Sequence, residues 1–82
     1  MATRADVYNA INGERNYQDA KWGGPEQDKL RSVGDFLIYM SQYIVRAKRT
    51  YTEGNEKAAL EEIRKVTALG VVCMEVHGAP ER

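Results

Sequence analysis

The sequence is poor in the residues that carry metal and redox chemistry. It contains one cysteine, Cys73, and one histidine, His77, so an internal disulfide cannot form and a zinc site built from Cys and His lacks ligands. Lys plus Arg number 12 and Asp plus Glu number 12, and the formal net charge of zero argues against a protein that grips a nucleic acid polymer through a basic face. We therefore predict neither a bound metal nor a cofactor.

Long apolar runs are also missing. No stretch approaches the roughly 18 apolar residues of a membrane-spanning helix, and residues 1–6 hold no apolar segment like that of a secretory signal. With 82 residues, the chain has the length of one domain, residues 1–82. We expect a cytoplasmic protein without a membrane partner.

The first helical segment is predicted over residues 3–21. Thr3 and Asp6 have the spacing of a capping box, with Asp in place of the usual Glu. Apolar side chains then recur at helical spacing. Gly13 weakens the middle of this helix by about 1 kcal/mol relative to alanine, so a break or kink is possible there.

Two further helices are predicted over residues 26–52 and 55–77. Pro25 suits the first turn of the second segment, which carries a helical apolar stripe. The stripe consists of Leu30, Val33, Leu37, Met40, Ile44 and Ala47. A short turn at Gly54 makes these segments antiparallel. The fold class is therefore all-α: an N-terminal helix plus a long antiparallel helical hairpin.

The second half of the last helix, residues 66–76, is apolar nearly all round. A helix without a polar face is buried on every side, and an 82-residue chain offers little to surround it. We therefore predict a homo-oligomer that associates through the C-terminal half of this helix.

The densest polar and aromatic stretch is residues 13–23, which holds the single tryptophan. Its aromatic rings suit stacking on a base, Arg15 and Lys21 suit a phosphate, and Glu14 or Gln18 suits a base edge. A structural interpretation remains open, in which Arg15 pairs with Asp19 and the aromatic rings serve the core. The candidate ligand-binding residues are Glu14, Arg15, Tyr17, Gln18, Lys21 and Trp22, with His77 joining from a neighbouring helix.

The same stretch resembles a motif in a family of small helical proteins from tailed phages and prophages. The matching pattern is Glu14-Arg15-x-Tyr17-Gln18-Asp19-x-Lys21-Trp22-Gly23, followed by residues 33–37, 63–70 and 74–78. Ser32 departs from the family, whose members often carry a histidine there. By functional analogy with phage sponges of CBASS and Thoeris signals, the resemblance implies an anti-defence protein in the host cytoplasm.

The leading hypothesis is thus a non-enzymatic protein that binds and sequesters a small, cyclic nucleotide signal. One alternative is an inhibitor that binds a host defence enzyme directly. Another is a reduced MazG-like nucleotide pyrophosphohydrolase, in which Glu61 or Glu62 would support Mg²⁺-dependent turnover. Glu53 and Glu56 have the Glu-x-x-Glu spacing of that class but straddle Gly54.

Overall fold

The first helix, α1, spans Arg4–Trp22 in the computed structural model, which describes all 82 residues. The predicted capping box is confirmed: the Asp6 amide donates to Thr3 Oγ1 at 3.1 Å, and the Thr3 amide donates to Asp6 Oδ2 at 3.0 Å. The helix runs without interruption through Gly13 and ends at Gly23, whose φ of 92° is left-handed. The break considered at Gly13 does not occur.

The predicted helix over 26–52 is wrong, because it is two helices. A single turn, α2, spans Pro25–Asp28, and α3 spans Val33–Thr52. The chain leaves the helical conformation before Ser32, whose Oγ accepts from the Asp35 amide at 3.0 Å while its own amide donates to Asp35 Oδ2 at 2.8 Å. This second capping box starts a new helix, and sequence reasoning missed it by following the apolar stripe alone.

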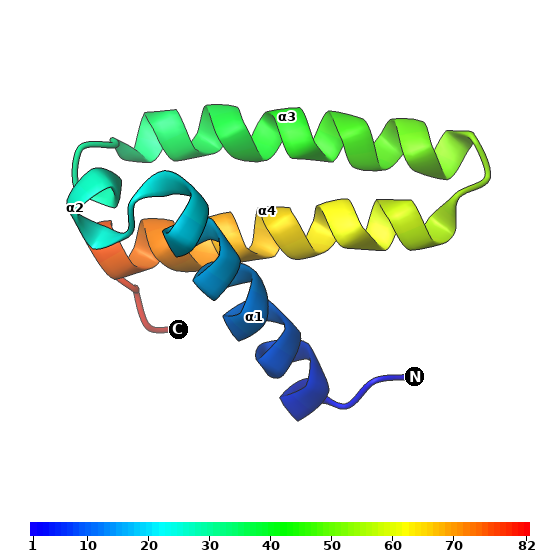
Figure 1. Cartoon of the computed structure of the whole chain (residues 1–82), viewed down its shortest axis with the longest axis horizontal. Helices are drawn as coiled ribbons and strands as arrows, with labels where there is room; N and C mark the ends of the chain where they lie inside the picture. Colours follow the sequence, from blue (N-terminus) through cyan, green and yellow to red (C-terminus); the bar gives the residue numbers. More distant parts are fainter.

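The last helix, α4, spans Glu56–His77 and runs antiparallel to α3 (Figure 1). The connection turns at Gly54, which has a left-handed φ of 83°, and the side chain of Asn55 accepts from the Ala58 amide. The predicted hairpin is confirmed, and the fold is all-α. None of the helices combines the length and hydropathy that crossing a membrane requires.

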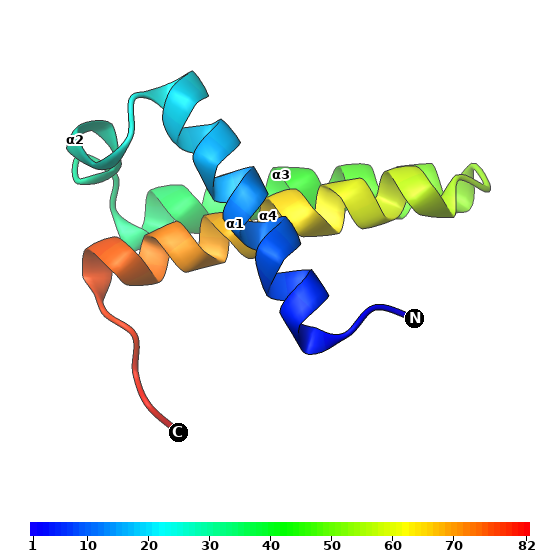
Figure 2. The ribbon, with the colours of Figure 1, turned by 60° about the horizontal axis from the view of Figure 1, so that its bottom comes forward.

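Helix α4 is the centre of the arrangement and contacts each of the other three helices. Viewed with the lower side of the molecule turned forward, α1 crosses in front of α4, and α3 lies behind it (Figure 2). Helices α3 and α4 therefore pack side by side as a pair, and α1 covers only part of the length of this pair, on one side.

The hydrophobic core lies between the left-hand ends of α3 and α4 in Figure 1 and consists of Phe36, Leu69 and Val72. Partly buried side chains pack around it: Trp22, Met40, Tyr43, Cys73 and Val76. Much of the apolar second half of α4 thus packs within its own chain, because α1, α2 and α3 surround it. The argument that this half needs a second subunit does not hold, while self-association itself stays a prediction.

Candidate functional site

Arg15 holds α1 against α4 instead of pointing into a pocket. Its Nε and Nη2 donate to the two carboxylate oxygens of Glu75 at 3.2 and 3.3 Å, and Nη1 donates to Asp19 at 3.0 Å. The side chain is only 9% exposed. Burial lowers the pKa of Arg15, but its hydrogen bonds to Glu75 and Asp19 outweigh that effect and raise the pKa. All three guanidinium nitrogens have carboxylate partners, so the predicted phosphate contact would have to displace them.

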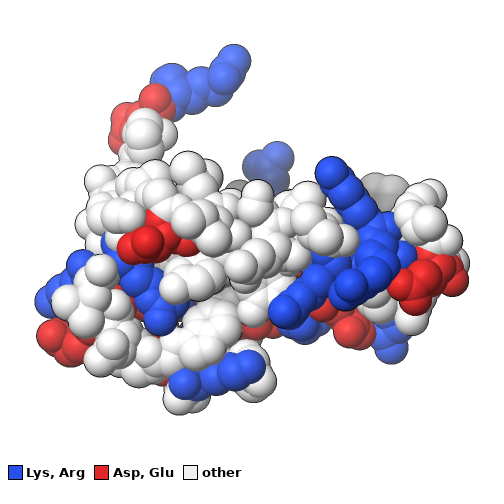
Figure 3. Space-filling model, turned by 90° about the horizontal axis from the view of Figure 1, so that it is seen from above, with Lys and Arg blue, Asp and Glu red and all other residues white.

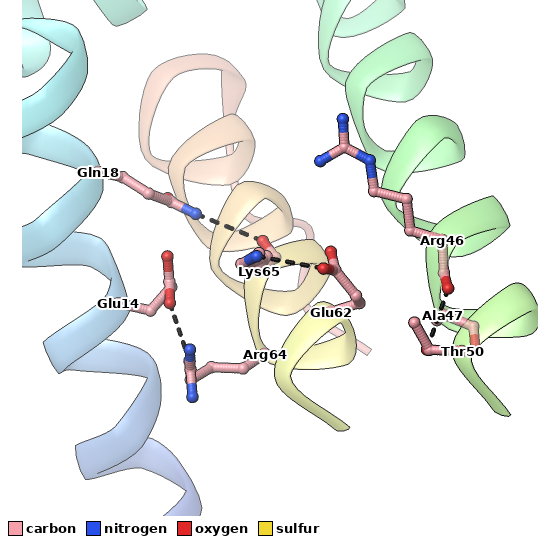
Figure 4. A network of polar contacts seen from close by, with 8 residues as sticks. All are labelled: Glu14, Gln18, Arg46, Ala47, Thr50, Glu62, Arg64 and Lys65. Atoms are coloured by element: carbon pink, nitrogen blue, oxygen red, sulfur yellow. Dashed lines mark hydrogen bonds and ion pairs between the residues drawn. The ribbon is translucent and has the colours of Figure 1, made fainter. Parts of the chain in front are cut away.

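Glu14 and Gln18 make the other polar side-chain contacts between α1 and α4 (Figure 4). The Nε of Arg64 donates to a buried Glu14 carboxylate at 2.8 Å. The Gln18 amide donates to the backbone oxygen of Lys65 at 3.4 Å, while its own Oε1 is buried without a partner. These two predicted ligand residues therefore position the helices, as Arg15 does.

Tyr17, Lys21 and Trp22 lie close together near the C-terminal end of α1. Tyr17 is 59% exposed, and the Lys21 ammonium lies 5.8 Å from the centre of its ring and 5.7 Å from that of Trp22. Trp22 packs against the core around Phe36 and also lines a small cavity with Tyr39 of α3. Of the two predicted stacking residues, Tyr17 is thus the accessible one.

His77 lies apart from this group. Its Nε2 is 2.8 Å from the backbone oxygen of Arg31, and its ring meets Phe36 edge to face with centroids 6.2 Å apart. Along α4, His77 is about 20 Å from Arg64, given 1.5 Å per residue. The seven predicted residues therefore do not converge on one pocket within a single chain.

An open groove between α1 and α4 is lined by a set of residues that only partly matches the predicted ligand-binding residues. Its volume is about 500 Å³, and it is lined by Ala10, Gly13, Glu14, Tyr17, Arg64 and Lys65. Arg64 and Lys65 were missed as site residues because both belong to the polar side of the last helix in the sequence. Their proximity to Tyr17 depends on how α1 crosses α4, and local periodicity does not encode that crossing.

Gly13 lies in this groove without a structural reason. Its backbone is helical, and a Cβ added there would meet no atom within 4 Å. A glycine in a helix interior costs about 1 kcal/mol relative to alanine. Neither a turn nor a close helix contact explains this cost.

Two further carboxylates near α1 and α4, those of Asp28 and Glu62, are largely buried. Burial raises the pKa of Asp28, and the positive charge of Arg15 only partly offsets this. Glu62, named above for the hydrolase alternative, is mostly buried, with one oxygen 3.2 Å from the Lys65 ammonium and the other without a partner. No three His, Cys, Asp or Glu side chains are placed to share a metal ion.

Comparison with protein-family models, curated proteins and solved structures found no match. The resemblance to phage proteins therefore remains a prediction from the residues quoted above.

Proposed function

We propose that the chain binds a small nucleotide in the groove between α1 and α4 and sequesters it unchanged. The groove has the size of a small-molecule site, for which roughly 300–1,000 Å³ is typical. Its walls offer an exposed aromatic ring, Tyr17, and a positive charge, Arg64. The resemblance to phage proteins directs the proposal toward a cyclic nucleotide immune signal.

The observation that carries this proposal is the coincidence of Gly13 with the exposed Tyr17. In a helix, residues four apart lie on the same face, so the missing side chain at position 13 leaves free space beside the ring. A base stacked on Tyr17 would occupy that space. Its phosphate would reach the guanidinium of Arg64, of which only Nε is bound by Glu14.

The residue roles change accordingly from those predicted. Tyr17 provides stacking, while Arg64, Lys65 and Lys21 provide positive charge. Glu14, Arg15 and Gln18 act as positioning residues that fix the angle between the two helices, and Trp22 serves the core. Sequestration requires only affinity, so the proposal assigns no catalytic group.

The test is isothermal titration of the chain with cyclic di- and trinucleotides, cyclic ADP-ribose isomers and NTPs, followed by mass analysis of the recovered ligand. We expect binding with the ligand returned intact. Tyr17→Ala should weaken this binding by about 5- to 150-fold, the range for loss of one base stack. Gly13→Leu should weaken it too, by filling the groove.

The matched control is Tyr8→Ala. Tyr8 is exposed to the same degree as Tyr17, 62% against 59%, but lies nine residues earlier and on the opposite side of α1. Equal affinity losses in the two tyrosine variants, or no heat with any nucleotide, would contradict the groove. Conversion of the ligand would contradict sequestration.

A second candidate function is that of an inhibitor that binds a host protein. Residues 36–45 of α3 contain no charge, although several of their apolar side chains are exposed. Figure 3 looks down on this helix and shows an uncharged area along it, with positive side chains gathered over one end. Such patches are typical of protein contacts.

A further inference from the structure

The chain exposes more surface than a folded monomer of its size. Its accessible area is 6156 Å², whereas monomers of 9.3 kDa expose about 5,000 Å². The ends, residues 1–3 and 78–82, are exposed, and so are many large apolar side chains on the helices. The excess is about 1,200 Å², and a standard protein interface buries about 800 Å² per partner.

Many of the exposed apolar side chains of the hairpin lie in two rows along one side of it. On α3, positions 33, 37, 40, 44, 47 and 51 follow steps of four and three residues, as in the seam of a helical bundle; of these, Ala47 is buried, Met40 is partly buried, and the other four are exposed. On α4 the corresponding row is Leu60, Ile63, Thr67, Gly70 and Met74. Neither row contains a charged residue.

A contact in the hairpin shows that the two rows adjoin. Gly70 lies against Met40, such that an added Cβ would be 3.6 Å from the Met40 Cε. Leu37 and Ile44 are the neighbours of Met40 in its row. The opposite flank of α3, with Tyr39 and Tyr43, borders Trp22 instead. The two rows thus share the side of the hairpin facing away from the C-terminal end of α1, and we call them the hairpin face; Leu60, Ile63 and Thr67 border the N-terminal half of α1 at its edge.

We propose that the hairpin face binds a second copy of this chain, which makes the protein a dimer with a four-helix bundle at its centre. In a two-fold dimer, the same face meets itself, and any charge on it would approach a like charge. A charge-free face avoids this repulsion. Two antiparallel hairpins with three- and four-residue spacing pack as a bundle, and the small residues Thr67 and Gly70 allow close approach.

The dimer expected from the sequence used the C-terminal half of α4, whereas this one uses only the exposed side of that half and adds α3 and the first half of α4. Leu69 and Val72 of that half are buried within the chain. The available surface is instead the exposed side of the hairpin, including Leu37, Ile63 and Met74. The groove beside Tyr17 shares no residue with the hairpin face, so a test of the dimer is not a test of the nucleotide site.

Sedimentation equilibrium of the full chain and two glutamate variants tests the proposal. Leu37 and Ile38 are neighbours, both 59% exposed, yet only Leu37 belongs to the hairpin face. We expect a wild-type mass of twice 9.3 kDa. Leu37→Glu should weaken dimerisation by at least about 30-fold, as for an interface hot spot, while Ile38→Glu should change it less than about 3-fold.

Circular dichroism of both variants verifies that the helices persist, and Met74→Glu provides the same test from α4 if Leu37→Glu does not fold. A wild-type chain that stays monomeric at about 100 μM overturns the proposal, whether or not it captures another protein. Equal weakening by Leu37→Glu and Ile38→Glu also overturns it, because the contact would then lie on the outer side of α3.

Discussion

Helix α4 makes two contacts of opposite character. Against α3 it packs the apolar side chains of Phe36, Leu69 and Val72. Against α1 it uses ion pairs and one amide hydrogen bond, with Ile11 as the one buried apolar side chain of α1. Apolar packing supplies more free energy, whereas directional polar contacts fix the angle at which one helix crosses another. The hairpin is therefore the stable unit, and the α1 contact is the weaker and more specific one.

The polar contact also explains why these residues looked like a ligand site in the sequence. Long charged and amide side chains beside aromatic rings are typical both of a ligand pocket and of a polar helix contact. Their partners on α4, Arg64 and Glu75, lie 50 and 60 residues further along the chain. Local sequence therefore cannot distinguish the two roles.

The largest effect should come from the apolar contact. Phe36→Ala should lower the free energy of unfolding by about 3–5 kcal/mol, the usual loss for a buried phenylalanine, because Phe36 is almost completely buried. Urea denaturation followed by circular dichroism measures this. A loss smaller than that for Arg15→Ala would reverse the ranking of the two contacts.

A smaller effect should arise at Asp28, which lies buried near Arg15. Because burial raises its pKa, the folded state takes up a proton before the unfolded state does. The charged carboxylate therefore costs stability at neutral pH, and the cost disappears as pH falls through the raised pKa of the folded state and then the pKa of the unfolded state. Asp28→Asn should stabilise the protein at pH 7, by less than about 1 kcal/mol given the opposing attraction of Arg15.

The pH dependence is the control for Asp28→Asn. The stability difference between Asp28→Asn and wild type should be largest at neutral pH and shrink on acidification. A stability gain that is equally large at pH 3 and pH 7 would show that the carboxylate charge is not its cause.

The helices and the hairpin follow from the sequence because their signals are local. Each of these signals acts within one turn of helix: the capping box at Thr3, the proline at position 25 and the glycine at position 54. The signal for the break before Ser32 is equally local, but the apolar stripe continues across the break and led to the prediction of one continuous helix. The crossing of α1 over α4 could not be predicted from local sequence, since it depends on contacts between distant residues such as Glu14 and Arg64.

The central claim, that the predicted ligand residues hold α1 on α4, is tested most directly by a double-mutant cycle between Arg15 and Glu75. The variants are Arg15→Ala, Glu75→Ala and the double variant, with unfolding measured in urea. The exposed pair of Lys29 and Glu26, 3.4 Å apart, is the matched control. We predict a coupling of about 1–2 kcal/mol for Arg15 with Glu75 and less than about 0.5 kcal/mol for the control. Equal couplings in the two pairs would contradict the account and return Arg15 to the candidate ligand residues.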